Sequence, residues 1–348
     1  MLVIIAVVCA VLAIVLPRKT RDSPIVTPPS ASPGTEHWPC REVLHSNFPD
    51  PNLLRHNGTW YAFATNNAAG HFGLSHVQLA TSPDFVNWTL CDYTEDPLPK
   101  LGDWLVPKSN LWAPNVLQRA DSKFVLYYAA TAANATGNHC VGAAVGDSPQ
   151  GPYDPLPTPL ACPTEIGGAI DPSSIIDSDG SIYLAYKVDG NNRGNGGDCE
   201  NTVPPLKDTP ILLQKLEQDG TTPLGPPVKI LDRTYEDGPL VEAPNLIRTV
   251  EGIYFLFFSS GCTRLPSYDV KYATSSNITG PYVRSPKRLL KTGDMGLLAP
   301  GSVSVTQDKS KWRMVFHARV KTDFGGVRAM YTANLIFNKT DASFDPAS

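Results

Sequence analysis

The chain has 348 residues, 42% of them hydrophobic, so it is long enough to bury a sizeable core as a single β domain. Its 33 prolines and 27 glycines favour many turns over long helices. The 29 basic and 33 acidic side chains give a net charge of −4, which provides neither a basic surface for nucleic acid nor a strong field for a charged substrate. We therefore expect a neutral ligand.

The first segment, residues 1–16, is apolar from Leu2 onward, and the basic cluster Arg18-Lys19-Thr20-Arg21 follows it. A membrane-spanning helix needs about 20 apolar residues, so the shorter run is interpreted as a signal peptide or a signal anchor. Residues 17–36 are a basic and then Pro/Ser/Thr-rich linker. We expect the folded domain to fill residues 37–348, with membrane contact only if the first segment stays uncleaved.

Two further features point to the secretory route. Acceptor sites for N-linked glycans occur at Asn57, Asn87, Asn134, Asn277 and Asn338. Cysteines beyond the first segment are Cys40, Cys91, Cys140, Cys162, Cys199 and Cys262. They allow up to three disulfides, whose pairing cannot be read from the spacing, and none of them has the spacing of a zinc site. A secreted, extracellular monomer is expected.

One short phrase recurs five times, each time with a proline just before an apolar strand. Its prolines are Pro51, Pro114, Pro172, Pro244 and Pro300, which are 63, 58, 72 and 56 residues apart. This period is close to that of a four-stranded propeller blade. The pattern predicts an all-β fold, a five-bladed β-propeller whose four-stranded antiparallel blades surround a central channel.

Turn signals complete the blades. Asn57-Gly58 predicts a type I′ hairpin, and Asp177-Ser178-Asp179-Gly180 predicts a second turn. The acidic turn lacks the downstream glutamate of a calcium loop, which favours an Asx turn. A second recurring phrase, at residues 80–88, 146–153 and 273–282, is expected to close an outer hairpin.

Glu242 lies between apolar residues just before the strand 253–258, so it is expected at a buried edge with a raised pKa, as a general acid requires. A glutamate that only caps a turn is the alternative. The innermost strands of a propeller line one channel, so Asp50, Asp171 and Glu242 should meet at one mouth. Three carboxylates in a small cavity cannot all ionise cheaply, and Glu242 has the most apolar flanks, so it is expected to keep a proton. For Asp50 and Asp171 the alternative is turn chemistry before proline.

The chain resembles glycoside hydrolase family 43 from about Phe48 to Phe337. The resemblance rests on Asp50-Pro51, Trp112-Ala113-Pro114, Ile170-Asp171-Pro172-Ser173, Glu242-Ala243-Pro244 and Thr279-Gly280-Pro281-Tyr282, in this order and at this spacing. It implies a five-bladed propeller and inverting hydrolysis of α-L-arabinofuranosyl or β-D-xylosyl linkages. It also implies a general base at Asp50, a carboxylate at Asp171 that tunes and orients the acid, and the general acid at Glu242. Inversion requires room for a water, with acid and base about 6.5–9.5 Å apart.

Three other side chains are candidates for the site. Trp112 is expected either to stack on a sugar ring or to lie between blades as a core residue. The resemblance places His317 beneath the active site, in contact with a cation through water; a core histidine is the alternative. Arg328 is expected to meet a sugar hydroxyl or the carboxylates, or else to lie at the surface. Endo-acting arabinanases of the family carry Gly-Pro-Gly-His where this chain reads Ala299-Pro300-Gly301-Ser302, which counts against a metal site and endo action.

The expected function is that of a secreted inverting glycosidase releasing α-L-arabinofuranose from plant cell-wall arabinan or arabinoxylan. Alternatives are a β-D-xylosidase acting on xylo-oligosaccharides, and a propeller that binds carbohydrate without turnover. The expected partner is a neutral oligosaccharide or polysaccharide. No cofactor is expected to be required, although a structural calcium or another ion in the channel is allowed. Loops such as residues 188–204 are expected to decide the sugar.

Overall fold

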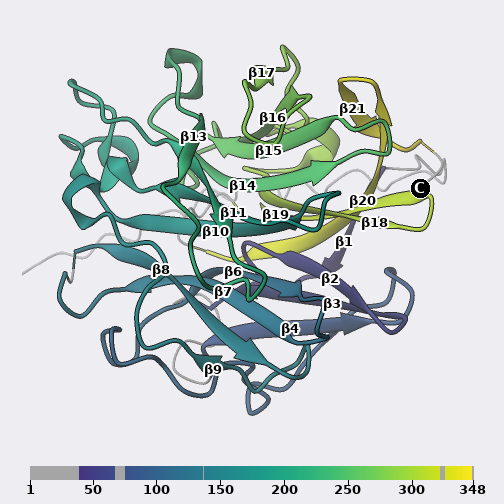
Figure 1. The fold of residues 1–348 in the computed structure, drawn as a ribbon. Helices are drawn as coiled ribbons and strands as arrows, with labels where there is room; N and C mark the ends of the chain where they lie inside the picture. The colour runs from purple at the N-terminus through teal and green to yellow at the C-terminus, as the bar shows by residue number, and fades with distance from the viewer. Residues whose placement is uncertain (1–38, 67–74, 136, 322–325, 347–348) are drawn as a thin grey trace, which may run out of the picture. The chain divides into compact units, whose positions relative to one another are not determined.

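The computed structural model describes residues 39–66, 75–135, 137–321 and 326–346. These residues form five antiparallel sheets arranged as the blades of a five-bladed β-propeller, as predicted (Figure 1). The helices within the described ranges are 3-10 turns of three or four residues, and none of these could cross a membrane. The expected leader and linker, residues 1–16 and 17–36, lie outside the described residues.

Blades 1 to 4 each consist of four consecutive strands. Blade 1 contains β2 (Asn52–His56), β3 (Thr59–Thr65), β4 (Val77–Ser82) and β5 (Thr89–Leu90). Blade 2 contains β6 (Trp112–Gln118), β7 (Phe124–Thr131), β8 (His139–Gly146) and β9 (Asp154–Pro155). Blade 3 contains β10 (Ala169–Ile176), β11 (Ile182–Val188), β12 (Ile211–Leu216) and β13 (Val228–Leu231). Blade 4 contains β14 (Val241–Arg248), β15 (Tyr254–Ser260), β16 (Asp269–Ser275) and β17 (Val283–Arg284). The 3-10 turns are η1 (Thr164–Ile166), η2 (Gly190–Arg193), η3 (Asp198–Glu200), η4 (Tyr235–Asp237) and η5 (Asp294–Gly296).

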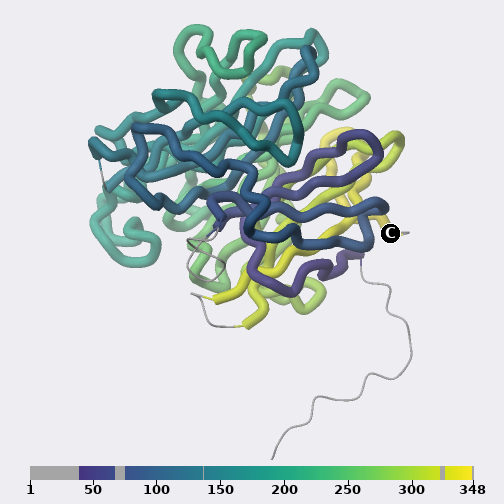
Figure 2. Tube along the Cα trace, turned by 90° about the horizontal axis from the view of Figure 1, so that it is seen from below, coloured from purple at the N-terminus to yellow at the C-terminus, as the bar shows by residue number. Residues whose placement is uncertain are grey.

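Blade 5 joins the two ends of the described chain. It contains β18 (Gly301–Asp308), β19 (Lys311–Arg319), β20 (Arg328–Asn338) and β21 (Asp341–Phe344), and β1 (Cys40–Leu44) from the other end of the propeller. β1 pairs with β20 in antiparallel register, so the purple and yellow ends of the chain lie side by side (Figure 2). This closure removes the open seam that a sheet of consecutive strands would leave in the ring.

The predicted turns are confirmed. Asn57 and Gly58 both have positive φ, 48° and 82°, as a type I′ turn requires, and they connect β2 to β3. Asp177 and Gly180 close the turn between β10 and β11. The second recurring phrase joins the third strand of a blade to its short outer strand in blades 1, 2 and 4.

Within the described residues, the buried apolar side chains form five clusters, and each one lies between two neighbouring blades. Phe255 and Phe257 of β15, for example, pack with Met314 and Phe316 of β19. A strand between two such layers is covered on both faces, which explains why the second strand of each blade is an almost unbroken apolar run rather than an alternating one. The core thus holds the blades in a ring around the channel.

Polar residues near the start of the innermost strands tie these strands together. Each such side chain accepts a hydrogen bond from a backbone N–H of the next blade, at 3.0 Å in all four cases. The pairs are Asn52 with Val116, Asn115 with Ser174, Asn245 with Val305, and Ser304 with Leu53. These buried contacts satisfy backbone groups that line the channel and have no strand partner there. The recurring phrase therefore has a structural role of its own, independent of chemistry.

Candidate active site

The recurring phrase bends the innermost strand in the same way in every blade. The residue before each proline adopts a left-handed conformation, which non-glycine residues rarely take. Their φ values are 54° for Asp50, 43° for Ala113, 56° for Asp171 and 50° for Ala243, and the corresponding residue of blade 5 is Ser302, before Val303, with φ 54°. In blades 2 to 5 the strand register also shifts at this point. Such a bulge re-aims the side chains around it, and strained positions of this kind cluster at functional sites.

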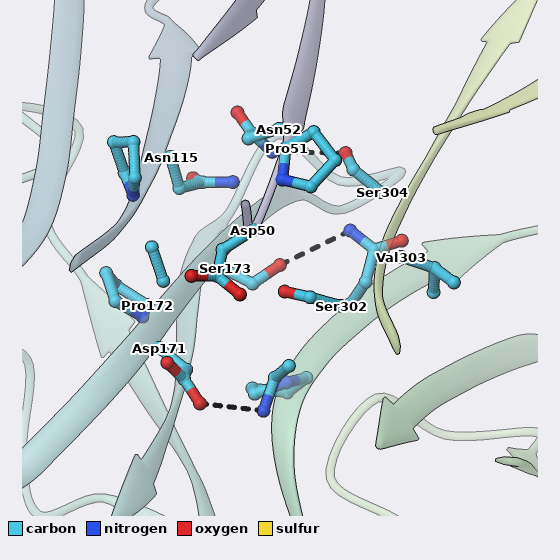
Figure 3. A pocket seen from close by; sticks show the side chains of 15 residues that line it. Asp50, Pro51, Asn52, Asn115, Asp171, Pro172, Ser173, Ser302, Val303 and Ser304 are labelled. Atoms are coloured by element: carbon cyan, nitrogen blue, oxygen red, sulfur yellow. Dashed lines mark hydrogen bonds between the residues drawn. The ribbon is translucent and has the colours of Figure 1, made fainter. Parts of the chain in front are cut away.

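The phrases of blades 1 to 4 line one pocket, and blade 5 contributes Ser302, Val303 and Ser304 to it (Figure 3). The predicted fifth copy at Ala299-Pro300 is therefore corrected, because the pocket-lining segment of blade 5 begins at Ser302. The first residue of each lining segment is a carboxylate in blades 1 and 3, Asp50 and Asp171, alanine in blades 2 and 4, and Ser302 in blade 5. Glu242 comes from blade 4, one residue before its alanine. Asp50, Asp171 and Glu242 interact electrostatically with one another or with common neighbours, so the predicted convergence of the three carboxylates is found.

Asp50 is held as an anion. The Thr65 hydroxyl donates a hydrogen bond to its Oδ2 at 2.7 Å, and Arg328 Nη1 lies 3.1 Å from its Oδ1. Burial raises the pKa of this carboxyl group, but Arg328, His317 and the hydrogen bonds from Thr65 and Ser302 together lower it below its usual value. An ionised carboxylate with a free lone pair has the state that a general base needs.

Asp171 has the opposite environment. Its Oδ2 accepts a hydrogen bond from the Ala243 N–H at 2.9 Å, drawn as the dashed line at Asp171 in Figure 3. Burial and then the neighbouring charge of Glu242 raise the pKa of Asp171 to about 8. Interacting carboxyl groups titrate as a pair, so Asp171 and Glu242 together retain a proton near neutral pH.

The surroundings of Glu242 are more polar than its place in the sequence indicates. In the sequence its neighbours are apolar, but in space its carboxylate meets donors. Lys187 Nζ lies 3.1 Å from Oε2, and the Tyr268 hydroxyl donates to Oε1 at 2.8 Å. Asp171 receives only one backbone N–H in addition to the Coulomb attraction of Lys187, so burial dominates there.

Lys187 and Tyr268 both contact Glu242, and neither was among the candidate residues predicted from the sequence. Lys187 is fully buried in β11, where it interrupts the apolar run Ile182–Val188. A lysine within a buried strand is a usable signal, because such a charge needs a partner. Tyr268 gives no such signal. It lies over Gly301, where a Cβ atom would be 2.0 Å from its ring, so the glycine of the fifth phrase makes room for this tyrosine.

His317 lies beneath the site, as expected, and its side chain is fully buried. Nδ1 accepts a hydrogen bond from the Asp50 N–H at 3.1 Å, and burial lowers the pKa of the ring to about 3. The neutral ring therefore carries its proton on Nε2, which has no partner among the described residues. A protonated ring nitrogen cannot ligate a cation, so only contact through water is compatible with this geometry. Among the described residues no group of three His, Cys, Asp or Glu side chains is placed to hold a metal ion.

The structure also decides how Arg328 is used. Its side chain is 13% exposed and it pairs with Asp50, so it belongs to the carboxylate cluster and the surface alternative is wrong. Because His317 is neutral near pH 7, Arg328 is the charge that keeps Asp50 ionised there.

The chain is similar to known proteins over most of the propeller. The model of glycosyl hydrolases family 43 matches residues 41–334. The chain belongs to this family. It is 28% identical over 291 residues to the β-D-galactofuranosidase xynD of Aspergillus niger. The match covers 79% of this chain and 75% of xynD. It is 25% identical to the extracellular exo-α-(1→5)-L-arabinofuranosidase ArbA of Cellvibrio japonicus, over 73% of this chain and 71% of ArbA. The crystal structure of a thermostable family-43 glycoside hydrolase superposes with a TM-score of 0.72 at 26% identity, covering 86% of this chain and 93% of that one.

The family 43 hydrolase has an aromatic residue beside the pocket. Trp112 is half-buried and precedes Ala113 and Pro114, which line the pocket. Its ring stacks on that of His139, with centroids 3.8 Å apart and planes 22° from parallel. The histidine thus fixes the orientation of the indole, which remains partly exposed next to the pocket-lining Ala113.

The loop after β11, expected to decide the sugar, packs against the strand that carries Glu242. The buried Asn201 donates hydrogen bonds to the carbonyl groups of Pro239, at 2.6 Å, and Lys207, at 2.9 Å. A disulfide between Cys199 and Cys262 ties this loop to the loop after β15. The family 43 hydrolase therefore has a wall of fixed conformation next to its acidic pair.

Proposed function

We propose that this family 43 hydrolase is a secreted inverting glycosidase that releases α-L-arabinofuranosyl residues from plant cell-wall arabinan or arabinoxylan. The observation that carries the mechanism is the division of charge within one pocket. Asp50 is held ionised by Arg328 and Thr65, whereas the pair of Asp171 and Glu242 retains a proton. Two carboxyl groups with opposed proton affinities are the arrangement that acid–base hydrolysis needs.

In the proposed reaction Asp50 removes a proton from a water as the water oxygen attacks the anomeric carbon. Glu242 donates its proton to the glycosidic oxygen while the bond between that oxygen and the anomeric carbon breaks. Attack from the face opposite the leaving group inverts the configuration. Asp171 accepts a hydrogen bond from the N–H of Ala243, next to Glu242, and in this way orients the acid. Asp171 also exchanges a proton with Glu242 and so returns Glu242 to its protonated form. Exchange with solvent then returns both groups to their starting states.

The choice of a furanoside is supported by the relatives. XynD is named for a β-D-galactofuranoside and ArbA for an α-L-arabinofuranoside. These two sugars share the configuration of the ring hydroxyl groups and differ in the exocyclic chain. A pocket that recognises the ring alone would accept both, and arabinofuranose is the smaller of the two. Ser302, in place of the histidine of the endo-acting arabinanases, supports action at chain ends.

Secretion is supported by covalent and surface features. Cys140 pairs with Cys162, and Cys199 pairs with Cys262. The asparagines of all five glycan acceptor sites are exposed. Thiol titration of denatured, unreduced protein from a secretory host should find the two thiols of Cys40 and Cys91 in the mature domain. Four or more reactive thiols would contradict the extracellular assignment.

Hydrolysis of three aryl glycosides tests the substrate, namely α-L-arabinofuranoside, β-D-galactofuranoside and β-D-xyloside. The arabinofuranoside should give the highest kcat/KM, and NMR should show the inverted anomer as first product. A higher kcat/KM on the xyloside would favour the β-xylosidase alternative. Binding of arabino-oligosaccharides without turnover of any of the three would favour a carbohydrate-binding propeller.

A further inference from the structure

Lys187 is the one fully buried ammonium group in contact with the acidic pair among the residues that the structure describes. Its Nζ lies 3.0 Å from Asp189 Oδ1 and 3.1 Å from Glu242 Oε2. Lys187 and Asp189 both come from the end of β11 in blade 3, whereas Glu242 comes from β14 in blade 4. The lysine therefore connects two blades at the position of the proposed acid.

An ammonium group removed from water is costly unless carboxylates surround it. Burial lowers the pKa of Lys187, but Asp189, Glu242 and Asp171 outweigh burial and raise it overall, so the lysine stays charged. Asp189 is itself only 8% exposed. Its contact anchors Lys187 to its own strand, which leaves the remaining N–H groups of the ammonium directed by geometry toward blade 4.

We propose that Lys187, anchored by Asp189, is a positioning residue for catalysis: it fixes the carboxylate of Glu242 and sets how many protons the pair of Asp171 and Glu242 holds. The inference rests on the proposed function in assigning the acid role to Glu242. With Tyr268 on Oε1 and Lys187 on Oε2, both carboxylate oxygens of Glu242 are held, so its rotamer is defined before substrate binds.

The charged and titratable groups around Lys187 are contributed by several elements. Asp171 comes from β10, Asp189 follows β11, Glu242 comes from β14, and Tyr268 precedes β16. Farther out, Asp50 acts on Asp171, and His139 of β8 faces Asp189. The charge of Lys187 lowers the pKa of Asp171. Removing that charge should raise the proton affinity of the pair. Removing the carboxylate of Asp189 should leave Lys187 to interact with the pair alone, which should lower the proton affinity of the pair.

The experiment compares Lys187→Met, Lys187→Arg and Asp189→Asn with the wild-type enzyme, using the pH profile of kcat/KM on a natural arabino-oligosaccharide. The alkaline limb reports the proton on the acidic pair. Lys187→Met should move this limb upward by about one pH unit or more, the effect of an opposite charge within 4–6 Å. Asp189→Asn should move it downward. Lys187→Arg should keep the limb near its wild-type position and lower the rate, because the charge stays and the geometry changes.

Lys271→Met is the matched control. Lys271 pairs with the buried Asp237 at 2.8 Å in blade 4, outside the carboxylate cluster. Lys271→Met should lower the stability of the protein as the Lys187 variants do, but it should leave the alkaline limb of the pH profile unmoved. If the Lys187 and Asp189 variants lowered the rate equally at every pH, like this control, the lysine would be only a structural ion pair and the proposal would be wrong. Should Lys187→Met not fold, the direction of the Asp189→Asn shift decides alone.

A substrate-free measurement separates this inference from the proposed function. The Tm of wild-type protein, Lys187→Met and Asp171→Asn is followed from pH 5 to pH 10. Because the pKa of Asp171 should be higher without the charge of Lys187, the Tm should continue to fall up to a higher pH in Lys187→Met than in wild type. This result does not depend on whether any glycoside is hydrolysed. An unchanged range would overturn the role of Lys187 even if arabinofuranosides are substrates. Failure to hydrolyse all three aryl glycosides would instead overturn the function.

Discussion

The main-chain N–H of Asp50 donates a hydrogen bond to Nδ1 of His317, across 267 positions in the sequence. This contact holds the strained residue that carries the proposed base, and it fixes the tautomer of the histidine at the same time. The two residues belong to blades 1 and 5, which meet where the ring is closed. The position of the base therefore depends on the closure of the propeller.

His317→Ala should lower kcat/KM and the free energy of unfolding, because it leaves the Asp50 N–H without an acceptor, at a cost of about 1–3 kcal/mol. His317→Asn, whose Oδ1 can occupy the place of Nδ1, should be milder. Urea unfolding and kcat/KM measure the two effects.

Chelation should leave partial activity in the wild type. Complete loss on chelation, reversed only by a transition metal, would show that the chemistry is misassigned.

Glu242→Ala and Asp50→Ala should differ in their dependence on the leaving group. An acid is needed only when the departing oxygen must be protonated, so Glu242→Ala should nearly abolish hydrolysis of an oligosaccharide yet spare much of the rate on an aryl glycoside. Asp50→Ala should impair both, because water must be activated in either case. The loss in kcat should be on the order of 10²–10⁴ for Glu242→Ala on the oligosaccharide and for Asp50→Ala on both substrates. The two substrates are measured in parallel. The reverse pattern would exchange the two roles.

Asp171→Asn should change the dependence of stability on pH. A carboxyl group whose pKa rises from 3.8 to about 8 on folding contributes stability that is present below pH 4 and is lost as the pH rises through 8. The wild-type Tm should therefore fall across this window more steeply than the Tm of Asp171→Asn. Identical slopes in calorimetry would place the retained proton elsewhere. The alkaline limb of the activity profile should move in the same variant.

Asn115→Ala should destabilise the ring. The Asn115 carbonyl oxygen accepts hydrogen bonds from both the N–H and the hydroxyl of Ser174, at 3.0 and 2.5 Å. Loss of a buried acceptor costs about 1–3 kcal/mol, and about 2–4 °C in Tm for each kcal/mol. Gln218→Ala, at an exposed side chain, is the control and should stay within about 0.5 kcal/mol of wild type. Equal effects would mean that the interblade bond adds nothing.

The sequence by itself determined the number of blades and the location of three carboxylates, because both are local properties. A proline phrase and an apolar strand recur along the chain, and in blades 1 to 4 the side chain before the proline, or one residue earlier, lies near the start of the innermost strand. Asp50, Asp171 and Glu242 follow from that pattern, and so does the type I′ turn at Asn57. The residue spacing within a blade is set by strand length and turn chemistry, which neighbouring residues specify.

Only the tertiary structure decided what surrounds those carboxylates. Lys187 meets Glu242 across 55 positions, and Tyr268 reaches the same side chain from a loop with no recurring pattern. The raised pKa of Asp171 comes from burial and from the charge of Glu242 on another blade, which the residues around Asp171 in the sequence do not show. The pairing of β1 with β20 was equally invisible, since it joins the two ends of the propeller. Electrostatic environments are sums over neighbours in space, and a sequence lists only the neighbours along the chain.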